Sequence, residues 1–347
     1  MIRLNGTLTA LAPITVSYVG MTGLPRTPHQ ELMLYGGTFR GPLRKACYRA
    51  LRHHLAGADG DPSNVFSLAD AYMLGEGVDV TNRTAAESGA PADPVSERRI
   101  RTANPMLDLF GRWKLAGRLA IGSMRTPESN LMTAGRGART DMFERDNREA
   151  MFLAPADRDT LMRQLESERA TQREIEQATQ QERDLKRRVR NADPAEKQTI
   201  NNELAALKTR VKELKNAREG ATESIKHPLN GFEAIAPGSE LPHRVTLIEG
   251  TDVNLGLLLM SLVELAREPY LGGYFAQGCG EFEADYSVSR FASGSLKPET
   301  IGRVAFGPDG VELDGDILNE AYQSFIDQLS SFDFHMHTLA DAKNADA

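Results

Sequence analysis

Apolar residues recur at every second position in several short stretches of the chain, a spacing that places them on one face of a β-strand. The first stretch spans residues 1–18, where Ile2, Leu4, Leu8 and Ala10 share a face. We expect further strands at residues 118–125, 243–250 and 282–288, and a short strand at 302–306.

Apolar residues spaced by three or four positions predict helices between and after these strands. In GGTFRGPLRKACYRALRHHL a glycine cluster opens a helix, with Leu43, Cys47 and Leu51 in its buried stripe. Two more helices are expected at residues 253–270 and 315–332. A strand, a helix and a strand on each side of a foreign insertion predict an α+β fold with a split core of the ferredoxin or RRM type. Such a core presents an open antiparallel sheet, which RNA-binding proteins commonly use.

The insertion, residues 156–226, is predicted to be an antiparallel helical hairpin. Its second half carries an unbroken 4-3-4-3 seam of apolar residues, which is typical of a coiled coil: Ile200, Leu204, Leu207, Val211 and Leu214. The sequence NADPAEK between the halves supplies a helix stop, with Pro194 at the first position of the second helix. The pattern predicts a structure and indicates no chemistry.

Two other segments are too polar to supply a core of their own. Residues 56–104 are rich in Gly, Pro, Asp and Ser around one short helical segment, SLADAYML, and end in the basic sequence SERRIRTANP. Residues 126–155 are polar and irregular. We expect both to be insertions into the core.

Composition narrows the class of protein. The 347 residues carry a formal net charge of -7, which argues against a generally basic nucleic-acid coat but allows a local basic surface. Cys47 and Cys279 have no CxxC partner, so we expect reduced thiols and no thiolate metal site. The N-terminus lacks the apolar core of a signal peptide, and no stretch is long enough to span a bilayer. We therefore expect a soluble, cytoplasmic protein.

The sequence YGGTFRGPLRKA, residues 35–46, has the composition of a phosphate-binding turn. Its three glycines let backbone amides approach a ligand closely, and the positive end of the following helix points the same way. Arg40, Arg44 and Lys45 add full charges. The segment predicts either a seat for a phosphodiester backbone or a glycine turn that caps a helix with solvated arginines. The GxxxxGK[ST] pattern of a nucleoside triphosphate loop fails here.

A second glycine-rich loop, LGGYFAQGCGEF, spans residues 271–282. Gly272, Gly273, Gly278 and Gly280 again let backbone come close to a ligand. One such loop is weak evidence by itself. Two of them, each beside a predicted helix at opposite ends of one split domain, favour a binding surface.

In chain order these motifs resemble the RAMP superfamily: a strand, then GG-x-x-[RK]-G-x-[LI]-R opening a helix, then a late helix followed by GG-x-x-x-x-G-x-G. Within it, the chain is most similar to the guide-RNA-binding backbone subunit of type IV CRISPR effectors. The resemblance covers residues 1–55, 105–155 and 228–292. DLFG, residues 108–111, resembles the family's middle section, and RTDMFERDNREAMF, residues 139–152, resembles its thumb.

The family implies a right-hand-like shape with a palm, a finger and a thumb. The corresponding segments are the palm at residues 1–55, 105–125 and 227–335, the finger at 56–104, the thumb at 126–155, the helical hairpin at 156–226 and a disordered tail at 336–347.

The resemblance implies a non-catalytic protein of antiviral defence that binds a guide RNA, a crRNA or another RNA, and oligomerises head to tail along it. Such a non-closing contact grows helical filaments. The implied partners are the guide RNA, further copies of the chain, other effector subunits and a target nucleic acid, with no membrane and no cofactor. Phosphate contacts would set the affinity without reading sequence. The residues expected to contact RNA are Arg26, His29, Gly36, Gly37, Thr38, Arg40, Arg44, Lys45, Arg49, Arg125, Arg136, Arg139, Met142, Phe143, Gly278 and Gly280.

Type III relatives in this superfamily cut target RNA with an aspartate in the loop after the first strand. That loop, residues 19–35, contains no aspartate, and Pro25 and Arg26 stand where the family pattern would place one. Glu31 is its only acid and His29 its only candidate base. We therefore expect no catalytic residue. The alternative is a type III-like ribonuclease that cleaves guide-paired target RNA with one of these two residues.

The other histidines show no HExxH or paired-carboxylate context. His335 and His337 form an HxH pair near the C-terminus, for which we expect a structural role and no metal. A third alternative is a structural coiled-coil protein whose globular part is a scaffold. The two basic glycine loops argue against this alternative.

Overall fold

The computed structural model describes residues 1–21, 23–57, 60–61, 65–78, 93–135, 151–191, 194–216 and 231–337. The chain divides into two units. Unit 1 comprises Met1–Gly135 with Gly231–Ala347, and unit 2 comprises Arg136–Asn230. Unit 1 contains the sheet, and unit 2 contains the helical hairpin.

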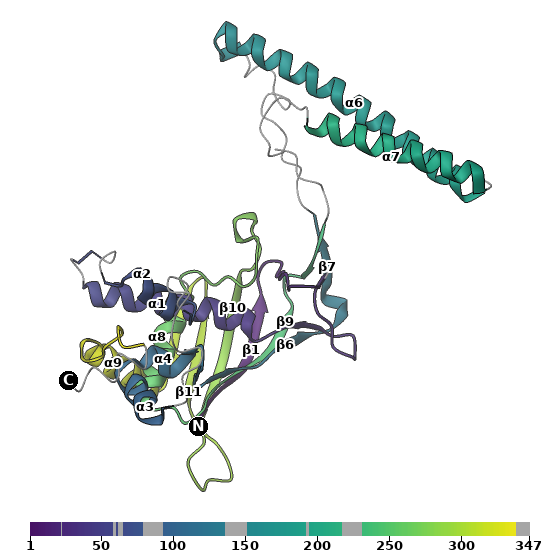
Figure 1. Ribbon diagram of the computed structural model, residues 1–347. Coiled ribbons are helices and arrows are strands. Elements are labelled where there is room, and N and C mark those ends of the chain that lie inside the picture. The colour runs from purple at the N-terminus through teal and green to yellow at the C-terminus, as the bar shows by residue number, and fades with distance from the viewer. Residues whose placement is uncertain are drawn as a thin grey trace. The chain divides into compact units, whose positions relative to one another are not determined.

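Unit 1 is a mixed α+β structure on a six-stranded antiparallel sheet with the order β12-β11-β10-β1-β9-β5 (Figure 1). The strands are β1 (Ile2–Ala10), β5 (Leu119–Ile121), β9 (Glu240–Leu247), β10 (Phe282–Arg290), β11 (Glu299–Gly307) and β12 (Gly310–Asp314). The α+β class predicted from the sequence is confirmed. The sequence pattern missed β12.

The alternation in the sequence decides which face of the sheet each residue occupies. In β1, Leu4 and Leu8 are fully buried while Asn5 is exposed. The strand ends at Ala10, earlier than the predicted 1–18. It ends there because the next two N–H groups both donate to the carbonyl of Glu281, and Pro13 has no N–H to continue the ladder.

Three helices cover one face of this sheet (Figure 1): α1 (Gly37–Ala56), α8 (Asp252–Leu265) and α9 (Asp316–Gln328). α8 packs between the other two and is buried over most of its length. Gly256 permits the close approach of α8 to α9, because a Cβ there would lie 2.5 Å from the Cβ of Phe325.

The segment between α1 and β5 contains more regular structure than its composition predicts. It holds α2 (Leu68–Gly75), α3 (Pro94–Ala103), α4 (Pro105–Phe110), and a small hairpin of β3 (Gly111–Arg112) and β4 (Leu115–Ala116). The sequence predicted one helix in 56–104, yet the described part of that range contains two. α3 escaped notice because it buries only Ser96 and Ile100, which is too little for an apolar stripe.

The strand predicted at 118–125 is two strands that join different sheets. β5 belongs to the main sheet, whereas β6 (Met124–Thr126) pairs with β2 (Leu32–Leu34). The chain turns between them, where the N–H of Gly122 donates to the carbonyl of Arg244.

A two-stranded ribbon carries the chain out of unit 1 and back into it. It consists of β7 (Leu131–Ala134), which follows the short helix η3 (Glu128–Asn130), and β8 (Phe232–Ile235). The last residue of β7, Ala134, lies opposite the first residue of β8, Phe232. The two ends of the insertion therefore leave the ribbon next to each other.

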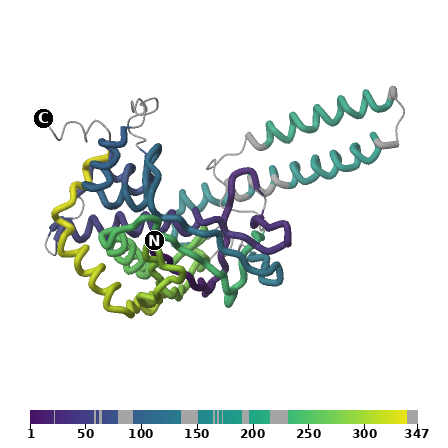
Figure 2. Tube along the Cα trace, turned by 90° about the horizontal axis from the view of Figure 1, so that it is seen from below, coloured from purple at the N-terminus to yellow at the C-terminus, as the bar shows by residue number. Residues whose placement is uncertain are grey.

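Unit 2 contains two antiparallel helices, α6 (Pro155–Asn191) and α7 (Pro194–Asn216), which pack against each other (Figure 2). Pro194 is the first residue of α7, as the sequence predicts. Ile175 and Ala178 of α6 and Ile200 and Leu204 of α7 are the buried residues of this pair. No helix in the described part of either unit is both long enough and apolar enough to cross a membrane.

The C-terminal segment after α9 returns to α2. Asp70 of α2 accepts hydrogen bonds from His335 Nδ1 at 2.9 Å and His337 Nε2 at 2.6 Å. Burial acts to raise the pKa of Asp70, but the hydrogen bonds from Ser67 and the two histidines outweigh it and lower the pKa. The packed chain thus continues through His337, two residues into the tail predicted at 336–347, and residues 338–347 lie outside the described part.

Candidate nucleic-acid interface

The predicted phosphate seat forms the first turns of α1. Gly36 is the N-cap, and a Cβ there would lie 2.3 Å from the carbonyl oxygen of Ile121 in β5. A Cβ on Gly37 would meet nothing within 4 Å. The hydroxyl of Thr38 is hydrogen-bonded to that of Tyr18 at 2.8 Å. Gly36 therefore serves the packing of the helix on the sheet, whereas Gly37 leaves accessible backbone.

Arg44 is not at this surface, although its spacing predicts a phosphate contact. Its side chain is buried, and its guanidinium donates to the carbonyl of Met73 at 2.9 Å and to that of Leu74, at the end of α2. Burial lowers the pKa of Arg44 to about 10, so it remains charged at neutral pH. We therefore assign Arg44 to the joint between α1 and α2 and leave it out of the interface.

Lys45 and Arg49, farther along α1, are both paired with acids. Lys45 lies 3.2 Å from Glu76, and both side chains are exposed. Arg49 contacts Glu264 of α8 at 3.4 Å and Glu268 at 3.1 Å. The first pair is open to a competing anion, whereas the second ties α1 to α8.

Arg26 lies in the loop before β2 and is held by two acids. Its guanidinium contacts Glu233 at 3.2 Å and Glu128 at 3.0 Å. The hydrogen bonds that Arg26 donates to Glu233 and Glu128 raise the pKa of Arg26, and the bond from Arg26 lowers the pKa of Glu233. Arg26 thus joins this loop to β8 and to the turn before β7.

The structure describes the surroundings of both candidate catalytic residues of that loop, Glu31 and His29. The carboxylate of Glu31 accepts a hydrogen bond from Thr27 at 3.3 Å and lies 3.9 Å from the guanidinium of Arg125 in β6. His29 is an exposed residue of the turn. Among the residues that the structure describes, no three His, Cys, Asp or Glu side chains are grouped to hold a metal ion.

The second glycine loop follows α8 and leads into β10, whose first residue, Phe282, pairs with Ala10 at the end of β1. Gly280 is buried, and its N–H donates to the carbonyl of Pro13 at 2.9 Å. Gly278 has a φ of 76° and is exposed, with open space where a Cβ would lie. Gly280 therefore serves the packing of this loop, whereas Gly278 leaves accessible backbone.

Four residues predicted from the thumb, Arg136, Arg139, Met142 and Phe143, lie outside the described residues.

A cleft of about 650 Å³ opens beside the first turns of α1, and sequence reasoning missed half of it. One wall carries Gly37, Arg40 and Gly41, and the other is the β3–β4 hairpin with Trp113 and Lys114 at its turn. The signal was present in the sequence as GRWK, an aromatic residue between two cations, directly before the strand at 118–125.

Arg40 crosses between the two walls of this cleft. Its Nη2 donates a hydrogen bond to the carbonyl oxygen of Phe110, the last residue of α4, while the side chain stays exposed. This bond orients the guanidinium over the cleft without neutralising its charge.

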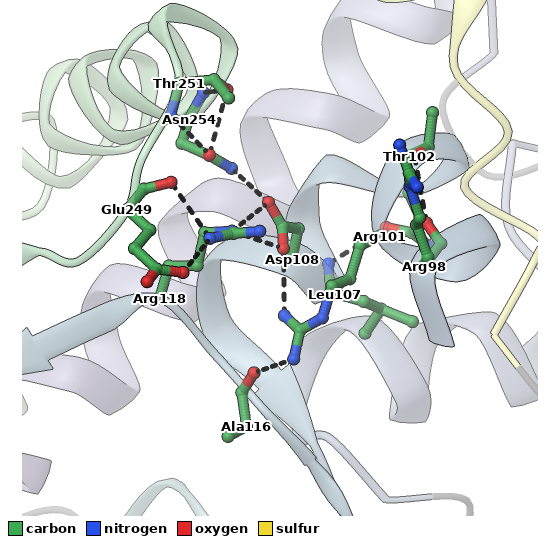
Figure 3. Close-up of polar contacts among 11 residues, drawn as sticks. Arg98, Arg101, Thr102, Leu107, Asp108, Ala116, Arg118, Glu249, Thr251 and Asn254 are labelled. Carbon is green, nitrogen blue, oxygen red and sulfur yellow. Dashed lines mark hydrogen bonds and ion pairs between the residues drawn. The ribbon is translucent and has the colours of Figure 1, made fainter. Parts of the chain in front are cut away.

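A polar cluster around Asp108 lies beside a second cleft, and its hydrogen bonds connect elements of the fold (Figure 3). The buried carboxylate accepts hydrogen bonds from Arg118 at 2.8 Å, Arg101 at 3.0 Å and the side-chain amide of Asn254 at 3.0 Å. These donors come from the start of β5, from α3 and from α8. Asp108 therefore joins three elements, and its oxygens are already engaged.

The open face of the sheet is a poor RNA-stacking surface. None of the outward-facing residues in its described strands is aromatic, and several are acidic. They are Arg3, Asn5, Thr7, Thr9, Ala120, Glu240, Pro242, Arg244, Thr246, Glu283, Asp285, Ser287, Ser289, Thr300, Arg303, Ala305, Gly307, Gly310, Glu312 and Asp314. RNA-binding sheets commonly stack bases on aromatic rings, which this face does not offer. The cleft beside the first turns of α1 is therefore the better candidate.

The chain matches no protein-family model, and a comparison with curated proteins gives no match either. What the cleft beside α1 binds has to be inferred from its geometry and charge.

Proposed function

We propose that the chain is a non-catalytic RNA-binding backbone subunit, which coats a guide RNA in successive copies within a type IV-like CRISPR ribonucleoprotein. The observation that carries the proposal is the cationic, glycine-lined cleft beside the first turns of α1, where the motif resembling the RAMP superfamily lies.

The chemistry of this cleft suits an RNA backbone better than a small substrate. Its charged lining is mainly cationic and includes no paired carboxylates and no His or Cys among the described residues. Phosphates are bound by such cations and by open backbone without reference to base identity, as a subunit that accepts any guide requires.

The connectivity of the sheet supports a ferredoxin-like palm. Strands β10, β1, β9 and β5 are neighbours in that order, α1 lies between β1 and β5 in the chain, and α8 lies between β9 and β10. A βαββαβ unit of this type has the same order and all-antiparallel pairing. The cleft then lies beside the start of β5, between the first turns of α1 and the β3–β4 hairpin.

The first test is whether RNA accompanies the protein and whether Arg40 and Lys114 hold it. The purified chain should carry RNA, and the double variant Arg40→Ala, Lys114→Ala should bind unrelated single strands with equally reduced affinity. Its plot of log affinity against log salt should be shallower by about one to two charges. The matched control is Arg303→Ala, a cation on the open face that pairs with Asp285, which should leave binding unchanged.

Unchanged binding by the double variant at low salt would mean that the RNA path lies elsewhere. Mass measurements on RNAs of increasing length test the assembly, because copies that coat a strand should increase in number with its length. Regular cleavage of guide-paired RNA with Mg²⁺, abolished by Glu31→Ala or His29→Ala, would instead establish the ribonuclease alternative.

A further inference from the structure

The β3–β4 hairpin presents the chain's single tryptophan to solvent on a fixed backbone. Trp113 is 66% exposed, although its backbone N–H donates to the backbone carbonyl of Gly77 at 2.9 Å. The hairpin is paired on both sides of the turn, Gly111 with Ala116 and Arg112 with Leu115. A large aromatic ring held at a rigid turn and left in water indicates a surface that another molecule covers.

The surroundings of Trp113 favour an anionic partner. Arg112 donates to the carbonyl of Trp113 at 2.8 Å, Lys114 follows in the turn, and Arg40 faces them across the cleft. Among the described residues that line the cleft, Glu76 is the only acid, and it is paired with Lys45. The described lining of the cleft thus combines an exposed π-face with cationic side chains on both walls.

The walls also leave room for a flat ligand. Six of the residues that line the cleft are glycines, and at three of them, Gly37, Gly41 and Gly75, a Cβ would meet nothing within 4 Å. Packing within the protein therefore does not require glycine at these three positions. The open space at these glycines can accommodate a planar group.

We propose that this cleft binds an unpaired nucleotide of single-stranded RNA, with the base stacked on Trp113 and a neighbouring phosphate between Arg40 and Lys114. The inference rests on the proposed RNA-binding function and specifies the conformation of the strand that it selects. A base inside a duplex already has both faces stacked, so duplex RNA should bind only through its phosphates. Stacking on an aromatic ring tolerates every base, which suits a guide of any sequence.

Because Trp113 is the only tryptophan, its fluorescence reports on this cleft alone. The full chain, freed of copurified RNA, is titrated with a short oligouridylate and with an RNA duplex of equal length, and binding is followed in parallel with end-labelled RNA. We expect the single strand to quench the emission and to bind more tightly than the duplex, which should not quench it.

Substitutions of Trp113 measure how much its ring contributes to RNA binding. Trp113→Ala should weaken binding of the single strand about tenfold, while Trp113→Phe should retain most of the affinity, since base stacking on an aromatic residue is worth about one decade. The control Leu296→Ala removes a fully exposed apolar side chain in the loop between β10 and β11, which does not line the cleft, and should change nothing.

Each contrary result has its own meaning. If the labelled single strand binds but Trp113→Ala has the wild-type affinity and the emission does not change, the nucleotide site is wrong while the proposed function stands. If Trp113→Ala instead dissociates RNA-free oligomers of the chain, the ring covers a contact with a second copy, which also overturns the inference. If the wild-type chain binds no RNA at low salt, the proposed function fails and the inference fails with it.

Discussion

At the scale of single residues, neighbouring glycines of the same motif are glycine for different physical reasons. Gly36 lies against the backbone of β5, so a side chain cannot be added there without moving the helix or the strand. Gly37, the next residue, borders the cleft and has open space around it. Sequence spacing cannot separate a glycine needed for packing from one that exposes backbone to a ligand.

This difference predicts opposite outcomes for two neighbouring substitutions. Gly36→Ala should lower the free energy of unfolding by about 1–3 kcal/mol, the usual cost of forcing extra volume into a packed site. Gly37→Ala should change it by no more than about 0.5 kcal/mol, yet weaken RNA binding because the new methyl group projects into the cleft. Urea denaturation and RNA titration on both variants make the comparison. Wild-type RNA affinity in Gly37→Ala would show that the backbone at this glycine does not approach RNA.

Sequence spacing also cannot separate buried from exposed cations in α1. The motif places Arg40 and Arg44 one helical turn apart, and from the sequence both could be solvated or could bind phosphate. Arg44 is buried because α2 packs over it and offers two carbonyls, a non-local contact that no spacing in α1 encodes. The helix, its start and its buried stripe could be predicted, but the division between surface and buried cations could not.

At the scale of elements, strong periodicity predicted the long pieces, and weak or local signals hid the short ones. The two long helices of unit 2 and the alternating strand β10 have the predicted spacing. α3 and α4 begin instead with the caps Asp93 and Asn104, each followed by a proline, a signal that is visible only when caps are sought without an apolar stripe. The segment 118–125 is divided because its first half pairs with β9 and its second half with β2, and these pairings are tertiary contacts.

Asp108 of α4 connects α3, α8 and the start of β5 through its hydrogen bonds. Asp108→Asn keeps the shape but removes the charge that Arg101 and Arg118 share, leaving two partly buried guanidinium groups without their acid. Because both arginines are about a quarter exposed, we expect a loss of about 2–3 kcal/mol in the free energy of unfolding, below the full cost of breaking a buried pair.

The matched control for Asp108 is Asp285→Asn, which removes an exposed partner of Arg303 on the open face. Surface pairs contribute little, so this change should cost at most about 1 kcal/mol. Both variants are compared with the wild type by urea denaturation. Equal losses in the two variants would contradict the assignment of Asp108 as a joint.

At the scale of the whole molecule, the chain consists of a split α+β unit interrupted by a helical hairpin, and this organisation was visible in the sequence. The seam of α7 and the stop at NADPAEK predict two helices that bury their apolar residues against each other. Sequence could not reveal how the insertion is joined to the rest. That information lies in the pairing of Ala134 with Phe232, two residues almost a hundred positions apart in the chain.

The pairing predicts that unit 1 folds without the insertion. Replacing residues 135–231 by Asn-Gly turns β7 and β8 into a two-residue hairpin, for which this dipeptide is favoured. The free energy of unfolding of unit 1 should stay within about 1 kcal/mol of the value in the full chain, since closing a long loop costs little more than closing a short one. A shorter deletion of residues 157–224, closed by a Gly-Ser linker, keeps the segment with Arg136 and Arg139.

The two deletions together test what the insertion contributes to RNA binding. Both should remain folded by circular dichroism and urea denaturation, because the ribbon and the core of unit 1 are intact in each. The short deletion should retain RNA, while the long deletion should bind it more weakly and with a shallower salt dependence, by about one charge for each phosphate that the removed arginines would have bound. If the short deletion alone abolishes RNA binding in a folded protein, the helical hairpin takes part in binding or in assembly. Charge reversal at Arg187 and Arg188, both exposed near the end of α6, should then reproduce part of that loss.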